Sequence, residues 1–141
     1  MKKDWGNGIP EYKQEDIMTK EEIHNFAMET VYKHEIESKK YKVLMAKDIA
    51  DYFPNFVVEK DNVKLFILVM ADVAPNIPQV PQEKKDLFIK YAEKYGGKAM
   101  FAPVSFGACD RERFNLSLML RGDAFYTRYC GLEEIYIKED L

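Results

Sequence analysis

The sequence predicts a single α+β domain in which a mixed β-sheet, centred on an apolar hairpin strand, is flanked by two helices. The first observation is a nearly continuous run of Val, Ile, Leu and Phe over residues 63–71, which is typical of a strand covered on both faces. The second is helical periodicity on either side of this run, at about residues 19–38 and 82–95. An apolar strand at 98–104 follows the second helix, so strand, helix and strand predict a crossover connection beside the central strand.

The composition is that of an ordinary globular domain. The chain has 141 residues, of which 47% are hydrophobic and 32% are charged. A formal net charge of −3 argues against bulk electrostatic binding to nucleic acid or to an anionic membrane. No apolar run reaches the ~18 residues that a membrane-spanning helix needs, and the polar first residues lack the apolar core of a signal peptide. We therefore expect a cytoplasmic protein without a membrane partner.

Nothing in the sequence divides the chain into several domains or staples it with disulfides. Residues 1–17 are interpreted as an N-terminal arm and residues 18–141 as the domain. Trp5 either docks the arm onto the domain or belongs to a disordered end. Two cysteines are too few for a disulfide framework, and we expect Cys109 and Cys130 to be reduced, partly buried thiols.

The helix predicted at 19–38 has a clear start signal. Thr19 is its N-cap and Glu22 follows three residues later, which are the two halves of a capping box. The histidines of this helix, His24 and His34, lie on different faces and cannot form an i,i+4 metal pair. We expect His34 to continue the apolar stripe and to pack inside the domain.

The central hairpin is predicted over residues 54–72. Its two strands are joined at Asp61-Asn62, polar residues that tolerate the positive φ of a tight turn. The middle of the hairpin carries no residue that performs acid, base or metal chemistry. The preceding residues 39–47 fit either a further helical turn or a short strand, and their lysines fit either a solvated rim or a phosphate contact.

A proline-rich connection leads from the hairpin to the second helix. That helix is predicted to end at Gly96-Gly97, which supplies a left-handed cap. Its expected core-facing stripe consists of Leu87, Phe88, Tyr91, Ala92 and Tyr95.

The last third of the chain predicts a second hairpin. Apolar residues recur at every second position over 114–120, which indicates a strand with one buried face. Gly122-Asp123 has glycine first, as a two-residue type II′ turn requires, and this register pairs Leu120 with Phe125.

This register predicts a candidate binding face. It places Arg121, Tyr126 and Arg128 together on the side opposite the leucines. All four arginines of the chain lie within residues 111–128, and arginine favours bidentate contact with phosphate or carboxylate. These three residues are our candidate binding site for an unknown protein partner or an anionic ligand. Pairing with nearby acidic side chains is the simpler alternative.

The order helix, hairpin, helix, strand over about residues 19–106 resembles the core of the restriction-endonuclease-like nucleases, whose signature is P-D followed by (D/E)-x-K. Residues 54–55, proline and asparagine, stand where P-D would stand, and residues 68–70, leucine, valine and methionine, stand where (D/E)-x-K would stand. In that family the acids bind Mg²⁺ and the lysine helps to activate water. The resemblance therefore implies a degenerate copy that is inactive as written.

Two classes of function follow from the sequence. The first is a non-catalytic binding or interaction domain with no cofactor and no catalytic residue. The second is a metal-dependent nuclease or other hydrolase, using Mg²⁺ and relocated acids, for instance Asp72 with Glu35 or Glu37. Asp72 is the weak metal candidate, because it closes the central strand, where ligands gather in α/β sheets.

Overall fold

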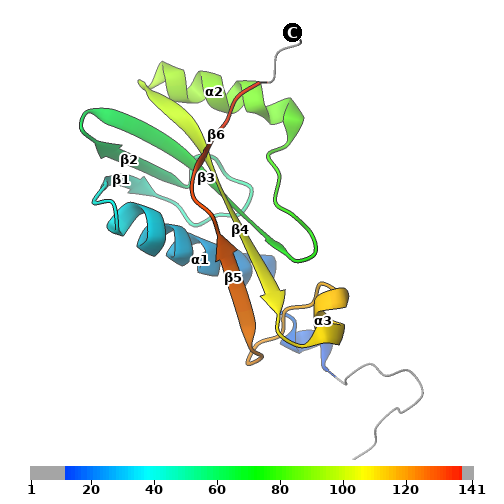
Figure 1. Cartoon of the computed structure of the whole chain (residues 1–141). Coiled ribbons are helices and arrows are strands. Elements are labelled where there is room, and N and C mark those ends of the chain that lie inside the picture. Colours follow the sequence, from blue (N-terminus) through cyan, green and yellow to red (C-terminus); the bar gives the residue numbers. More distant parts are fainter. Residues whose placement is uncertain (1–11, 138–141) are drawn as a thin grey trace, which may run out of the picture.

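The computed structural model describes residues 12–137 of the chain, so Trp5 and most of the predicted arm lie outside the described residues. These residues form a mixed six-stranded sheet with helices on both faces, which confirms the predicted α+β class (Figure 1). The elements in chain order are η1 (Gln14–Asp16), α1 (Lys20–Val31), η2 (Tyr32–Glu37), β1 (Lys42–Ala46), β2 (Phe56–Lys60), β3 (Val63–Val73), η3 (Gln82–Lys84), α2 (Lys85–Lys94), β4 (Gly97–Ala108), α3 (Arg111–Asn115), β5 (Phe125–Tyr129) and β6 (Glu133–Glu134).

The sheet is built around β3, as the apolar run predicted. The strand order is β1-β2-β3-β4-β5, and the short β6 also pairs with β4. β3 runs antiparallel to β2 and parallel to β4, and α2 makes the crossover between the two parallel strands. Over the described range 12–137, no helix is both long enough and apolar enough to cross a membrane.

The side chains of β3 alternate between two cores. Ile67 and Val69 belong to the core under α1, and Phe66 and Leu68 belong to the core under α2, which contains Ala92. Val69 is fully buried and Leu68 is 2% exposed. The prediction that both faces of this strand are covered is therefore confirmed.

The turn of the central hairpin also has the predicted chemistry. Asp61 and Asn62 have φ values of 52° and 66°, the left-handed conformation that a type I′ turn requires at both positions. Residues 42–46 form β1, which pairs with β2 through an irregular register. The strand alternative for residues 39–47 is thus the observed one.

The first helix begins as predicted and ends with a different periodicity. Thr19 and Glu22 form the complete capping box, in which each side chain bonds the other residue's backbone N–H. Beyond α1 the chain forms the π-helical segment η2, in which the next buried position after Val31 lies four residues on, at Glu35. Glu35 and Ile36 are therefore buried and His34 is exposed, so the predicted packing of His34 is wrong.

The predicted second hairpin does not form. Asp110 caps α3, because its Oδ1 accepts a hydrogen bond of 3.0 Å from the backbone N–H of Arg113, and this helix replaces the start of the expected strand. Leu116 is 49% exposed, and Leu120 makes an isolated bridge to Ile17. β5 pairs instead with the long strand β4, from Val104 opposite Tyr129 to Ala108 opposite Phe125.

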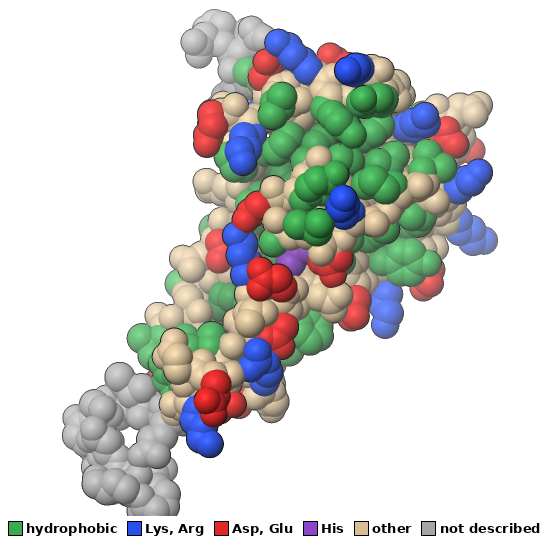
Figure 2. All heavy atoms as spheres, turned by 180° about the vertical axis from the view of Figure 1, so that it is seen from behind, with side chains coloured by type: hydrophobic (Ala, Val, Ile, Leu, Met, Phe, Trp, Pro, Cys, Tyr) green, Lys and Arg blue, Asp and Glu red, His purple; other side chains and the backbone are tan. Residues whose placement is uncertain are grey.

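Several apolar side chains are more exposed than the sequence indicated. Figure 2 shows hydrophobic side chains gathered over the half of the molecule that holds α2. Leu87 is 64% exposed, and Tyr91 and Tyr95 are also exposed, so the predicted stripe of α2 is only partly covered. Cys109 and Cys130 are both exposed and unpaired with each other, which corrects the expected partial burial.

Truncation of Leu68 measures how much the central strand contributes to stability. Leu68→Ala should lower the free energy of unfolding by about 2–5 kcal/mol, because it leaves a cavity between β3 and α2. Urea denaturation measures this change, with Leu87→Ala as the matched control, which should change stability by less than ~0.5 kcal/mol. A loss below ~1 kcal/mol for Leu68→Ala would contradict the central position of β3.

Candidate functional site

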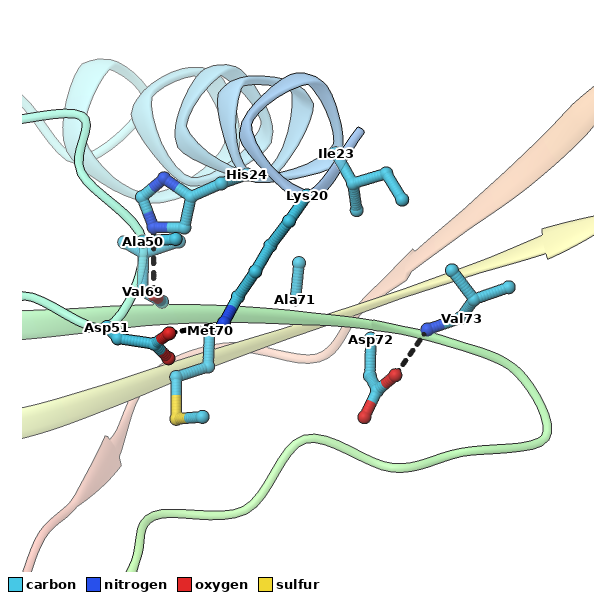
Figure 3. A pocket seen from close by; sticks show the side chains of 10 residues that line it. All are labelled: Lys20, Ile23, His24, Ala50, Asp51, Val69, Met70, Ala71, Asp72 and Val73. Atoms are coloured by element: carbon cyan, nitrogen blue, oxygen red, sulfur yellow. Dashed lines mark hydrogen bonds and ion pairs between the residues drawn. The ribbon is translucent and has the colours of Figure 1, made fainter. Parts of the chain in front are cut away.

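A pocket of about 440 Å³ lies beside the C-terminal half of β3, between α1 and the loop that joins β1 to β2 (Figure 3). We call it the strand-edge pocket. Its lining residues are Lys20, Ile23, His24, Ala50, Asp51, Val69, Met70, Ala71, Asp72 and Val73.

The pocket exists because β2 is shorter than β3. Pairing between the two strands ends at Phe56 and Ile67, whereas β3 continues to Val73. β4 pairs with β3 along this whole continuation, on the opposite edge. The last part of β3 therefore has one edge without a neighbouring strand.

Asn55 fills the first part of this edge with a side chain instead of a strand. Its Nδ2 donates to the carbonyl oxygens of Lys47 and Ile49, both at 3.0 Å. Its Oδ1 accepts a bond of 2.8 Å from the N–H of Val69, and its backbone N–H donates to the carbonyl oxygen of Ile67. We call these hydrogen bonds the Asn55 clasp. Asn55 is fully buried, so the clasp joins the β1–β2 loop to β3 out of contact with water.

His24 covers the next acceptor on the same edge. It lies on α1 and is 3% exposed, with Nε2 at 3.1 Å from the carbonyl oxygen of Val69. Its Nδ1 lies 2.6 Å from Oδ1 of Asp48, and Asn25 donates to the other oxygen of that carboxylate at 2.7 Å. Both ring nitrogens therefore lie within hydrogen-bond distance of an oxygen atom, which fixes the orientation of the ring.

Charged side chains form the rim of the pocket. Lys20 reaches across β3 to an ion pair with Asp51 (Figure 3). Asp72, the metal candidate from the sequence, does lie here, and its Oδ1 accepts a bond of 2.8 Å from the N–H of Val73. Within residues 12–137 no three His, Cys, Asp or Glu side chains gather as a group that could hold a metal ion. The pocket thus offers a few fixed polar groups rather than a clustered set of ligands.

Glu35, proposed from the sequence as a possible companion of Asp72, belongs to another pocket. Its Oε1 accepts a bond of 2.6 Å from the hydroxyl of Tyr129, and its Oε2 lies 2.5 Å from Nζ of Lys39. Burial, together with this hydrogen bond, raises the pKa of Tyr129 well above its usual value, and the carboxylate raises the pKa of Lys39. This second pocket, of about 520 Å³, does not include Asp72, and Glu37 is exposed.

The hairpin register that grouped Arg121, Tyr126 and Arg128 is wrong, and the structure places the three residues differently. Arg121 precedes β5 and binds Glu22 of α1 with two hydrogen bonds, of 2.8 and 2.5 Å. Tyr126 and Arg128 are exposed on β5, and the Tyr126 ring stacks on Phe114 at a centroid distance of 6.4 Å. Arg121 therefore takes the alternative of local pairing, while the role of the other two as a binding face stays a prediction.

The Arg121–Glu22 pair gives a pH-dependent prediction. Hydrogen bonding by Arg121, the largest cause, together with the backbone N–H of Thr19, lowers the pKa of Glu22 from 4.5 to about 2. Arg121→Ala should raise this pKa toward its ordinary value, which NMR titration of the Glu22 carboxyl measures. Because the folded-state pKa is lowered, the pair stabilises the fold above pH 4.5, and this stabilisation is lost as the pH falls toward 2.

The pH dependence of stability and a control variant complete the test of the Arg121–Glu22 pair. The stability difference between the wild-type protein and Arg121→Ala should shrink as the pH falls below the ordinary carboxyl range, since protonated Glu22 no longer accepts both bonds. Arg128→Ala is the matched control and should leave the Glu22 titration unchanged. An unchanged pKa of Glu22 in Arg121→Ala would show that the pair is absent in solution.

Comparison with known proteins identifies a family and nothing more specific. No curated protein matches the sequence, and no solved structure matches it either. Residues 21–135 match the family described as a domain of unknown function, DUF8840. This match runs from the first turn of α1 to the segment just after β6, and it includes every residue that lines the strand-edge pocket except Lys20. Because it spans most of the chain, the protein belongs to the DUF8840 family.

Proposed function

We propose that this protein is a non-catalytic, cytoplasmic binding domain built on a degenerate restriction-endonuclease-like core, and that the strand-edge pocket binds its ligand. The observation that carries the proposal is the state of Asn55. Both amide hydrogens and the carbonyl oxygen of this buried side chain are bonded within the chain. A side chain held in this way cannot turn toward a metal ion or a substrate.

The order of elements supports the comparison with that core. The chain runs through α1, the β2–β3 hairpin, α2 and then β4, which is the order on which the resemblance rests. At the positions of the nuclease acid and lysine, Leu68 lies in the core under α2 and Met70 lines the pocket. Neither side chain can bind a hard cation or activate water. The positions that carry catalytic residues in the nucleases therefore carry apolar side chains here, and the strand-edge pocket lies beside them.

The chemistry of the hollow supports a binding role. Ile23, Met70 and Ala50 supply apolar surface, and the pairs His24–Asp48 and Lys20–Asp51 supply fixed polar groups. A mainly preformed pocket with few convergent polar groups is the usual anatomy of a ligand site. The volume of about 440 Å³ lies within the range of such sites.

One observation favours the alternative, a metal-dependent hydrolase. Asp51 and Asp72 both line the strand-edge pocket, and carboxylate oxygens are the ligands that Mg²⁺ prefers. Asp51, however, is engaged by Lys20, and Asp72 has one oxygen bonded to the backbone of Val73. We therefore keep the hydrolase as the second candidate.

Calorimetric titration with Mg²⁺ and with Mn²⁺ separates the two candidates. The binding-domain proposal expects no saturable heat in the micromolar range for the wild-type protein. Micromolar affinity that disappears in Asp72→Asn, and persists in the control Asp61→Asn at the exposed hairpin turn, would overturn it in favour of the hydrolase.

The binding role itself is tested by NMR with a library of small polar fragments. We expect at least one fragment to shift the amide signals of residues 69–73 together with those of Ala50 and Asp51, because all of them line one pocket. A library that leaves these signals unchanged would contradict the assignment of this pocket as the binding site.

A further inference from the structure

We propose that the ligand of the strand-edge pocket is an extended peptide segment, which adds to the open edge of β3 and pairs with the main chain of Ala71. This inference rests on the proposed function, because it names the ligand of the same pocket.

The direction of the backbone groups along β3 follows from its pairing. In a strand the N–H and C=O groups of one residue face the same edge, and those of the next residue face the opposite edge. Val69 bonds Asn55 and His24 on the edge away from β4, whereas Ala74 donates to the carbonyl oxygen of Phe106, on β4. The main-chain N–H and C=O groups of the odd-numbered residues therefore face the edge away from β4, and Ala71 is one of these residues.

The residues before and after Ala71 are capped on this edge. The N–H of Val69 donates to Asn55 and its carbonyl accepts from His24. The N–H of Val73 donates to Oδ1 of Asp72 at 2.8 Å, and its carbonyl accepts from the N–H of Asn76 at 3.0 Å. Side chains and a turn thus replace the missing strand on either side of Ala71.

Within residues 12–137, Ala71 is the residue of this edge that presents both main-chain groups to the pocket without a partner. No hydrogen bond from the rest of residues 12–137 is found at these two groups, and Ala71 is half-buried in the pocket wall. A residue of an extended antiparallel peptide can bond both groups, because it exchanges two N–H···O hydrogen bonds with the residue opposite. Strand addition to an exposed sheet edge is an established mode of peptide recognition.

The side chains beside this edge indicate which peptide fits. Figure 3 shows Ala71 pointing to the α1 side of β3 and Asp72 pointing to the opposite side. A ligand residue paired with Ala71 places its side chain near Ile23, where an aliphatic group packs. Its neighbour lies opposite Asp72, where a basic group finds a carboxylate. The ligand is therefore an extended segment that alternates aliphatic and basic residues.

A fluorescein-labelled, capped pentapeptide of alternating valine and arginine is the probe. We expect it to bind in fluorescence anisotropy and to slow hydrogen exchange of the Ala71 amide at least tenfold at saturation. The same peptide with glutamate in place of arginine should bind at least tenfold more weakly.

Two modified peptides test the main-chain contact without changing the protein. Methylation of the valine amides, which face β3, should weaken binding at least tenfold. Methylation of the arginine amides, which face away from β3, should leave binding within threefold and serves as the matched control. Equal binding of the two modified peptides would overturn strand pairing.

Protein variants give an independent measure. Ala71→Pro removes the outward N–H and leaves the pairs with β4, so it should abolish binding of the probe in fluorescence anisotropy. If that variant does not fold, Asp72→Lys decides the question. It should weaken the arginine peptide at least tenfold and strengthen the glutamate peptide, whereas Asp61→Lys at the hairpin turn should change neither.

The outcomes separate this inference from the proposed function. Protection that appears along β1 or β5 instead of at Ala71, or no binding of the probe, overturns the inference. If polar fragments still bind the strand-edge pocket in that case, the proposed binding role stands and only its peptide ligand is wrong. If neither the fragments nor the probe binds, both proposals fail.

Discussion

The hydrogen bonds of the buried Asn55 amide are the constraint on which the rest of the structure depends. They join two carbonyl groups of the β1–β2 loop to one N–H of β3, and among protein side chains only the amide of Asn or Gln supplies two donors and an acceptor together. The clasp lies where the pairing of β2 with β3 ends, and it holds the β1–β2 loop against the edge of β3. The loop then forms one wall of the strand-edge pocket, which exists because the clasp keeps it there.

The same contact links the fold to the proposed function. A carboxylate at position 55 would accept hydrogen bonds but donate none, so the requirements of a nuclease acid and of this clasp are incompatible in one side chain. His24, on α1, caps the next group of this edge, because its Nε2 contacts the carbonyl oxygen of Val69. Asp48 contacts the other ring nitrogen and is itself held by Asn25, so the ring has a fixed orientation. Among the residues that the structure describes, Ala71 is the position on this edge of the central strand whose main-chain groups have no partner, and it lies in the wall of the strand-edge pocket.

Local chemistry in the sequence predicted much of the fold. The Asp61-Asn62 turn, the capping box at Thr19 and the nearly continuous apolar run each depend on neighbouring residues, and each was correct. The π-helical turn that buries Glu35 has no such local signal, and a helix cap at Asp110 outweighed the alternating pattern that followed it. Of the site, the sequence singled out Asp72 as a possible ligand and Asn55 and Met70 as replaced catalytic positions, but not their contacts, since those such as that of His24 with Val69 span 45 residues and depend on tertiary packing.

The replacement Asn55→Asp tests this account most directly, because it removes the two amide donors at almost constant shape and places a carboxylate where the proposed resemblance to nucleases expects an acid. Urea denaturation at pH 7 should show a loss of about 3 kcal/mol or more, since a buried carboxylate would face two carbonyl oxygens. The loss should be smaller at pH 4, where a protonated carboxyl can donate one bond. The exposed Asn76→Asp is the control and should change stability by less than ~0.5 kcal/mol. An Asn55→Asp protein as stable as the wild type at pH 7 would contradict the central role of the clasp.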